Sequence, residues 1–209
     1  MPFTVEQFFG VFRAYNLAVW PAQWVLTTAG VVALAAFLSR RAIAIRAGLL
    51  VLGALWLWMA IAYHWAQFRS INPAATIFAL LFLSGAGVLF WTGLRLRPRE
   101  REAPRSWRDA VSLLLAVYGL SLYPLLNPLF GHAFPEAPGF GLPCPTTIFT
   151  IGVLGLIPPR PPRAALVVPV AWSAVGTTAA VLLGVTQDYV LGLAGLWGIW
   201  SWMRWRYCT

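Results

Sequence analysis

The stretch PAATIFALLFLSGAGVLFWTGLR, residues 73–95, carries no charged side chain before Arg95. About 20 apolar residues in an α-helix cross the hydrocarbon core of a bilayer, which is about 30 Å thick. The whole chain has this character, because 60% of its 209 residues are apolar and only 10% are charged. A soluble domain has about 25% charged residues. The sequence therefore predicts an all-α integral membrane protein.

Six further apolar segments, bounded by Arg, Pro or Gly, are interpreted as spans. The seven predicted spans cover residues 17–38, 45–66, 73–95, 109–128, 144–158, 164–184 and 188–203. Together they use roughly 140 residues at about 20 residues per span, so residues 1–209 are expected to form a single polytopic membrane domain. Residues 3–15 show a capping-box pattern at Thr4 and Gln7 and apolar residues at helical spacing, which predicts an amphipathic helix lying in the membrane interface.

The arginines predict the orientation of this domain. With seven spans and the N-terminus outside, thirteen Arg lie on the cytoplasmic side and only Arg13 and Arg69 lie outside, as the positive-inside rule requires. If the short segment 144–158 were re-entrant, the split would fall to nine against six, so a full span is favoured. The absence of Lys fits a GC-rich bacterium. We therefore expect a multi-pass protein of the bacterial cytoplasmic membrane with its C-terminus in the cytoplasm.

The stretch PGFGLPCP, residues 138–145, is expected to dip into the outer leaflet and so make up the missing length of segment 144–158. Irregular backbone at that depth is tolerated only where it is buried in protein or lines a wet cavity. The sequence therefore predicts a polar pocket that faces outward.

Several classes of function are excluded by residues that the chain lacks. Without Lys there is no retinal Schiff base, and no phosphate loop, dinucleotide fingerprint, GxSxG, HExxH or CxxC is present. Nucleic acid is not expected as a partner despite the net charge of +9, because the basic residues lie in the predicted cytoplasmic connections. Cys144 and Cys208 fall on opposite predicted faces and cannot form an internal disulfide.

The side chains that could act as acids, bases or ligands gather at the predicted outer face: His64, His132, Glu136, Cys144 and Asp188. Cys144 begins a predicted helix, whose positive end favours a reactive thiolate. Two His, one Cys and one carboxylate could hold a zinc or copper ion, so His64, His132, Cys144 and Asp188 are the candidate metal ligands. Haem held by the two His is a less favoured alternative. Each residue also has a structural interpretation, as a helix cap, an interface residue or a packing residue.

Short strings along the chain resemble those of a bacterial family of multi-pass membrane proteins that is classed only as a domain of unknown function. The strings are AYHW (62–65), INPAA (71–75), GH (131–132), PCPTT (143–147) and QDY (187–189). The resemblance runs over nearly the whole chain. It implies no activity, cofactor or catalytic residue.

Three functions stay open. The favoured one is a pocket that binds a metal ion or a small solute for transport or sensing. The second is a membrane-embedded enzyme with Cys144 as nucleophile or redox group, His132 as base and Asp188 as the orienting group. The third is a structural or assembly subunit of a larger membrane complex or a homo-oligomer, in which the small-residue stripe Gly192, Gly195 and Gly198 receives a helix of this chain or another.

Overall fold

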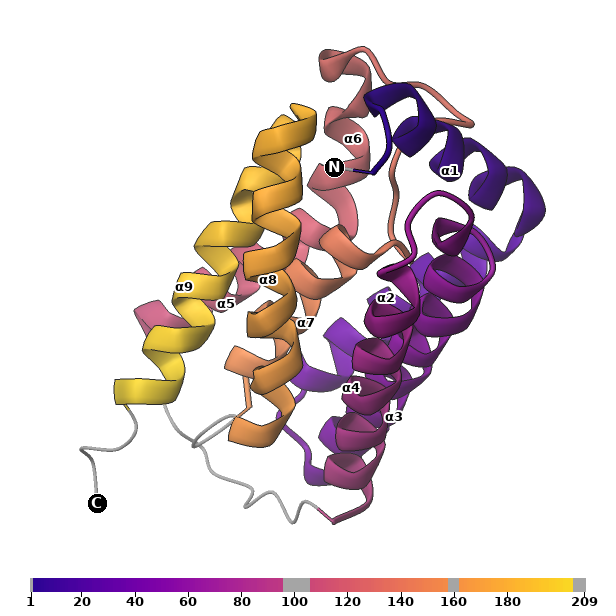
Figure 1. Ribbon diagram of the computed structural model, residues 1–209. Coiled ribbons are helices and arrows are strands. Elements are labelled where there is room, and N and C mark those ends of the chain that lie inside the picture. The colour runs from indigo at the N-terminus through magenta and orange to yellow at the C-terminus, as the bar shows by residue number, and fades with distance from the viewer. Residues whose placement is uncertain (1, 96–105, 158–161, 205–209) are drawn as a thin grey trace.

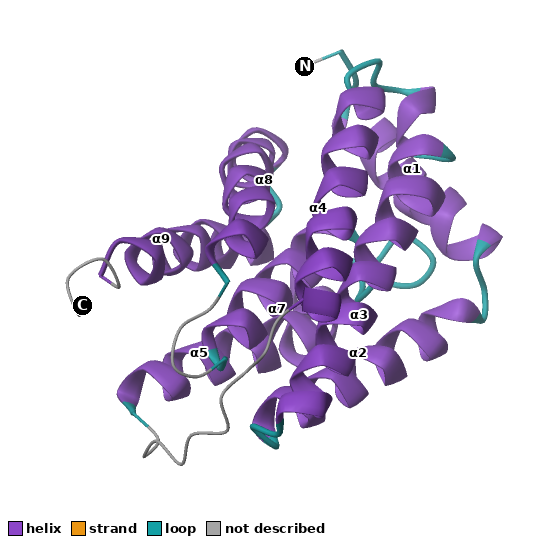
Figure 2. Ribbon diagram, turned by 90° about the horizontal axis from the view of Figure 1, so that it is seen from below, coloured by secondary structure: helices purple, strands orange, loops and turns teal. Residues whose placement is uncertain are grey.

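A computed structural model describes residues 2–95, 106–157 and 162–204 (Figure 1). Within these ranges the chain forms helices and no strand, which confirms the all-α prediction (Figure 2). The α-helices are α1 (Val5–Ala18), α2 (Ala22–Leu38), α3 (Ala42–Trp58), α4 (Ala75–Arg95), α5 (Trp107–Val117), α6 (Tyr123–Leu126), α7 (Pro143–Gly155), α8 (Arg163–Leu183) and α9 (Tyr189–Arg204).

Two of the long helices contain a π-helical segment. Helix α3 continues into the π-helix Met59–Trp65, and the π-helix Tyr118–Leu122 joins α5 to α6. The wider i→i+5 hydrogen bonding of a π-helix is rare and is frequently found at functional sites. Both segments lead toward the end of the molecule that carries α1, which we call the α1 end (Figure 1).

Four of the described helical segments are long and apolar enough to cross a membrane. They are Ala42–Ser70, Ala75–Arg95, Trp107–Phe130 and Arg163–Leu183. Helices α1 and α2 meet at 90° and pass the same test as a pair, which gives a fifth candidate. Every predicted span overlaps a helix. However, α7 has 13 residues and α9 has 16, which is fewer than the about 20 residues that cross a bilayer. Length and apolarity therefore support four or five of the seven predicted spans.

Helix α1 lies across the α1 end and buries its apolar face on the rest of the molecule (Figure 1). The predicted capping box is present, since the Gln7 N–H donates to the Thr4 hydroxyl at 3.2 Å and the Thr4 N–H donates to the Gln7 side chain at 2.9 Å. Phe8 and Phe12 are buried, whereas Val5 is exposed. The predicted amphipathic helix is thus present, and its apolar face contacts protein.

The glycine stripe of α9 packs against α8 of the same chain. Gly192 lies against Thr177, Gly195 against Ser173 and Gly198 against Val170, so that a methyl group added at any of the three would press on α8. Small residues allow two helix backbones to approach closely. This finding answers the alternative that the sequence left open, because the neighbour of the stripe is internal.

Helix α7 occupies the centre of the molecule, with α5, α8 and α9 around it (Figure 2). Its residues from Pro143 to Leu154 are buried, except Cys144, which is half-buried. The chain of residues 131–142 runs from the α1 end down to the start of α7 (Figure 1). The first turn of α7 therefore lies inside the molecule, with Cys144 on it.

Candidate functional site

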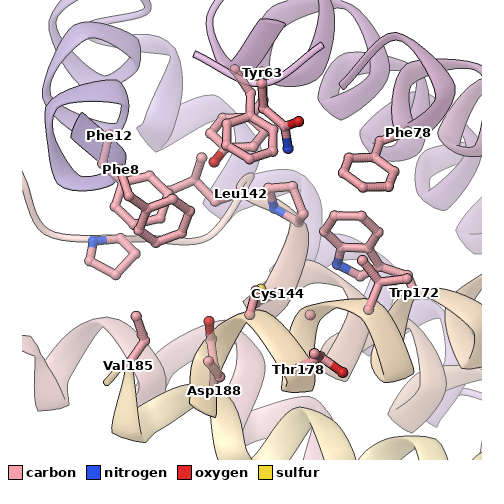
Figure 3. Close-up of a pocket in the computed structure, with 18 of the residues that line it drawn as sticks. Phe8, Phe12, Tyr63, Phe78, Leu142, Cys144, Trp172, Thr178, Val185 and Asp188 are labelled. Atoms are coloured by element: carbon pink, nitrogen blue, oxygen red, sulfur yellow. The ribbon is translucent and has the colours of Figure 1, made fainter. Parts of the chain in front are cut away.

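A cavity of about 380 Å³ lies beneath α1, between α4, α8 and the first turn of α7 (Figure 3). Its wall is mainly apolar and rich in aromatic rings. The aromatic lining residues are Phe3, Phe8, Phe12, Tyr63, Phe68, Phe78, Tyr123 and Trp172. The sequence predicted a polar pocket, but the polar side chains of this wall are few, namely Tyr63, Asn72, Tyr123, Cys144, Thr178 and Asp188 beside the indole of Trp172.

Helix α8 leaves the space for the cavity. Its lining residues are Trp172, Val175, Gly176, Thr178, Ala179 and Ala180. All but Thr178 recur every three or four positions and therefore lie on one face of the helix. After Trp172 these side chains are no larger than valine, which leaves room between this face of α8 and the phenylalanines of α1. The predicted dip also contributes, since Leu142, Pro143 and Cys144 line the cavity.

The polar end of the cavity is built around Asp188. This residue ends the short 3-10 turn Thr186–Asp188 that connects α8 to α9, and its side chain points into the cavity (Figure 3). The Tyr123 hydroxyl donates a hydrogen bond to Asp188 Oδ1 at 2.5 Å. The thiol of Cys144 interacts with the same carboxyl group. Tyr123 and Cys144 thus both contact the carboxyl group of Asp188, although Asp188 is far from them in the sequence.

The indole of Trp172 extends this cluster. A Cβ atom placed on Gly176 would lie 3.5 Å from both Trp172 Nε1 and Cys144 Sγ, so the indole nitrogen and the sulfur flank the same glycine. Among the described residues, Trp172 Nε1 has no hydrogen-bond partner that meets ordinary geometry, although it is buried. The buried indole N–H therefore lies near the Cys144 thiol at the cavity wall.

Burial governs the ionisation of Asp188, which the structure places in the connection before α9 and not in that helix, although the predicted span 188–203 began with it. Removal from water raises the pKa of this carboxyl group from 3.8 to about 6, against the smaller lowering by its hydrogen bonds with Tyr123 and Cys144. The carboxyl group is therefore mostly ionised at neutral pH. No Arg or His is among the described residues that line the cavity.

His64 lies in the π-helix Met59–Trp65 and is completely buried among aromatic rings. Its ring centroid is 4.5 Å from that of Phe82 and 5.1 Å from that of Trp172. Neither ring nitrogen has a hydrogen-bond partner within the described part of the chain. His64 thus contacts a residue of the cavity wall, but it is not itself a lining residue.

His132 and Glu136 lie on the outside of the α1 end. The His132 ring stacks on Phe9 with 4.2 Å between centroids, and Glu136 pairs with Arg13 at 3.5 Å. Both contacts attach the chain of residues 131–137 to helix α1. Neither side chain lines the cavity.

The structure brings together only two of the four candidate ligands, Cys144 and Asp188. Across residues 2–95, 106–157 and 162–204, no group of three or more His, Cys, Asp or Glu is placed to hold a metal ion. The proposed triad of Cys144, His132 and Asp188 is not assembled either, because His132 packs on the Phe9 ring of α1, whereas Cys144 lies inside the cavity. The geometry therefore supports neither a metal centre nor a cysteine–histidine nucleophile.

Sequence reasoning did not include Tyr63, Tyr123 and Trp172 among the site residues. The available signal was the spacing of small residues after Trp172 on α8, which marks a helix face with room beside it. The proximity of Tyr123 to Asp188 had no such signal, since it depends on how α5, its π-helix and the α8–α9 connection pack.

Fold and site together define an all-helical protein with several apolar helices of membrane-spanning length and an aromatic cavity that ends at one buried carboxyl group. Residues 5–209 match a family of unknown function, DUF6064. The chain belongs to this family, which confirms the resemblance to a domain of unknown function. No curated protein and no solved structure matches the chain.

Proposed function

We propose that this protein binds a small, largely apolar molecule in the cavity beneath α1, for transport or sensing of that molecule. The observation that carries the proposal is the cavity itself. Its volume of about 380 Å³ falls in the range of roughly 300–1,000 Å³ for small-molecule sites, which are mostly apolar with a few placed polar groups. A mainly apolar wall that is rich in aromatic rings and holds a few polar side chains has this character.

The proposal places the cavity in the outer half of a bacterial cytoplasmic membrane that the chain crosses seven times. The ends of α4 and α9 lie opposite α1 (Figure 1), and Arg95 ends α4 there. Since Arg is enriched on the cytoplasmic side of membrane proteins, α1 is placed outside. Helix α7 is too short to span alone, but it starts inside the molecule after the buried Phe140–Leu142 stretch, as the proposed dip requires.

The test compares small molecules that remain bound to purified wild type with those bound to a variant whose cavity is filled. Ala179→Trp adds a large side chain at a lining position of α8. Val181→Trp is the matched control, because this nearby residue of the same helix is 62% exposed. Organic extracts of the three proteins, purified in lipid nanodiscs, are compared by mass spectrometry.

We expect at least one compound in near-stoichiometric amount with wild type and Val181→Trp, and its loss with Ala179→Trp. Melting curves show whether each variant is folded, and Ala179→Leu is the milder filling variant if Trp disrupts the helix. If the three folded proteins retain the same compounds, the cavity is not a binding site and the proposal is refuted.

A further inference from the structure

No positively charged side chain lies beside the Asp188 carboxyl group among the described residues that line the cavity. Asp188 is only 4% exposed, and neither Arg nor His is among the described lining residues. A buried carboxylate loses its hydration, and proteins normally compensate this loss with an ion pair or a bound cation. Within the described lining, the carboxylate of Asp188 is thus a buried negative charge that faces the cavity without a positive side chain beside it.

The neighbours of Asp188 stabilise its anionic form without neutralising it. The Tyr123 hydroxyl donates to one carboxylate oxygen, and the Cys144 thiol interacts with the same group. Hydrogen bonds to a charged group are stronger than neutral ones. They lower the cost of holding the charge, but neither of them carries a positive charge, and a positive ligand group would complete the site.

The aromatic wall suits the same kind of ligand. Phe8 and Phe12 come from α1, Tyr63 from the π-helix and Trp172 from α8, and all four side chains surround the space that Asp188 faces (Figure 3). Aromatic faces attract cations, and cages of aromatic rings recognise organic ammonium groups. The same rings bury an apolar ligand body.

We infer that the cavity takes an organic cation, with its ammonium group against Asp188 and its apolar body among the aromatic side chains of α1, α8 and the π-helix. This inference rests on the proposed function and adds the charge class of the ligand. A metal ion does not fit this cavity, since Cys144 and Asp188 are the two candidate metal ligands among its described lining residues.

The test uses two probes of the same shape, benzyltrimethylammonium and its neutral isostere neopentylbenzene. Each is titrated into the full-length protein in nanodiscs, with empty nanodiscs as the reference for partitioning. Wild type should bind the ammonium compound at least about tenfold more tightly, the effect of one cation–π and carboxylate contact. This comparison needs no variant.

Asp188→Asn keeps the shape and an acceptor for Tyr123 but removes the charge. It should abolish the preference by weakening the ammonium compound about tenfold and leaving the neutral one unchanged. Glu136→Gln is the matched control, because it removes a carboxylate of the α1 end that lies outside the cavity; it should change neither affinity. Asp188→Glu should restore the preference.

Equal binding of the two probes by wild type, or a preference that persists in Asp188→Asn, would overturn the inference. The inference would also be overturned if the compound that is extracted from wild type and lost in Ala179→Trp proved to be neutral or anionic. In the last case the proposed function survives while the charge class fails, so the two failures are distinguishable.

Discussion

At the scale of single residues, the sequence located Cys144 and Asp188 but not the role of their neighbours. Both are rare polar residues beside long apolar runs, so their selection needed only the sequence. His132 and His64 met the same criterion, yet one stacks on Phe9 and the other is buried among aromatic rings. Sequence spacing indicates which end of a helix a residue occupies, but not which neighbour its side chain faces.

Asp188 predicts how stability depends on pH. Its pKa of about 6 in the folded protein lies above the ordinary 3.8, so protonation favours the folded state. The stabilising contribution is complete below about pH 4 and is lost as pH rises toward 6, by up to about 3 kcal/mol. The titratable side chains that interact with it are Tyr63, Tyr118, Tyr123 and Cys144, and Tyr and Cys ordinarily titrate well above this range.

Melting temperatures measured between pH 4 and pH 7 check this prediction. Wild type should lose stability over the window, and Asp188→Asn should lose less, because its side chain does not titrate. Glu136→Gln should keep the wild-type slope. A slope that is the same in wild type and Asp188→Asn would contradict the assignment.

At the scale of helices, the sequence indicated their positions well because apolar runs and caps are local signals. Thr4 and Gln7 gave the start of α1, and the bounds of α4 and α8 match the predicted spans within a few residues. The 90° turn between α1 and α2 and the burial of Phe8 and Phe12 were not predictable. Phenylalanines at helical spacing suit a lipid surface and a protein surface equally.

Loosening α1 should open the cavity. Thr4→Ala removes the cap of α1, which costs about 1 kcal/mol, and the helix that carries Phe8 and Phe12 over the cavity frays more often. In a Cys208→Ser background, monobromobimane should therefore label Cys144 several-fold faster in Thr4→Ala. The matched control is Ser106→Ala, which removes the capping residue of α5. Equal acceleration by both variants would mean that α1 does not control access.

The packing of α8 on α9 gives a prediction about glycine. Gly195→Ala forces a methyl group onto Ser173 and should destabilise the protein by roughly 1–3 kcal/mol. Ser173→Gly in the same chain removes the obstacle and should restore part of the loss in melting temperature. Gly87→Ala is the control, since nothing lies within 4 Å of the added Cβ and helix propensity favours Ala. A neutral Gly195→Ala would contradict the close α8–α9 contact.

At the scale of the whole molecule, composition predicted an apolar helical protein, and the helices agree. The number of spans was harder to predict, because α7 is a short helix at the centre of the molecule and α1 folds back over the cavity. Whether such segments count as spans depends on tertiary packing, which hydropathy does not report. The cavity also depends on tertiary packing, since it lies in the space that α1, α7 and α8 leave between them.

The proposed topology can be tested with two introduced cysteines at opposite ends of the molecule. Ala133 and Ser106 are both exposed; Ala133 lies in the chain that packs on α1, and Ser106 precedes α5. In a Cys208→Ser background, a membrane-impermeant maleimide added to intact cells should label Ala133→Cys, whereas Ser106→Cys should react only after lysis. Cys144 is half-buried. The Cys208→Ser protein without either new cysteine therefore measures how much Cys144 itself is labelled. Labelling of Ser106→Cys from outside would invert the proposed orientation and place the cavity in the cytoplasmic half of the membrane. The positive-inside rule would then fail for this arginine-rich chain.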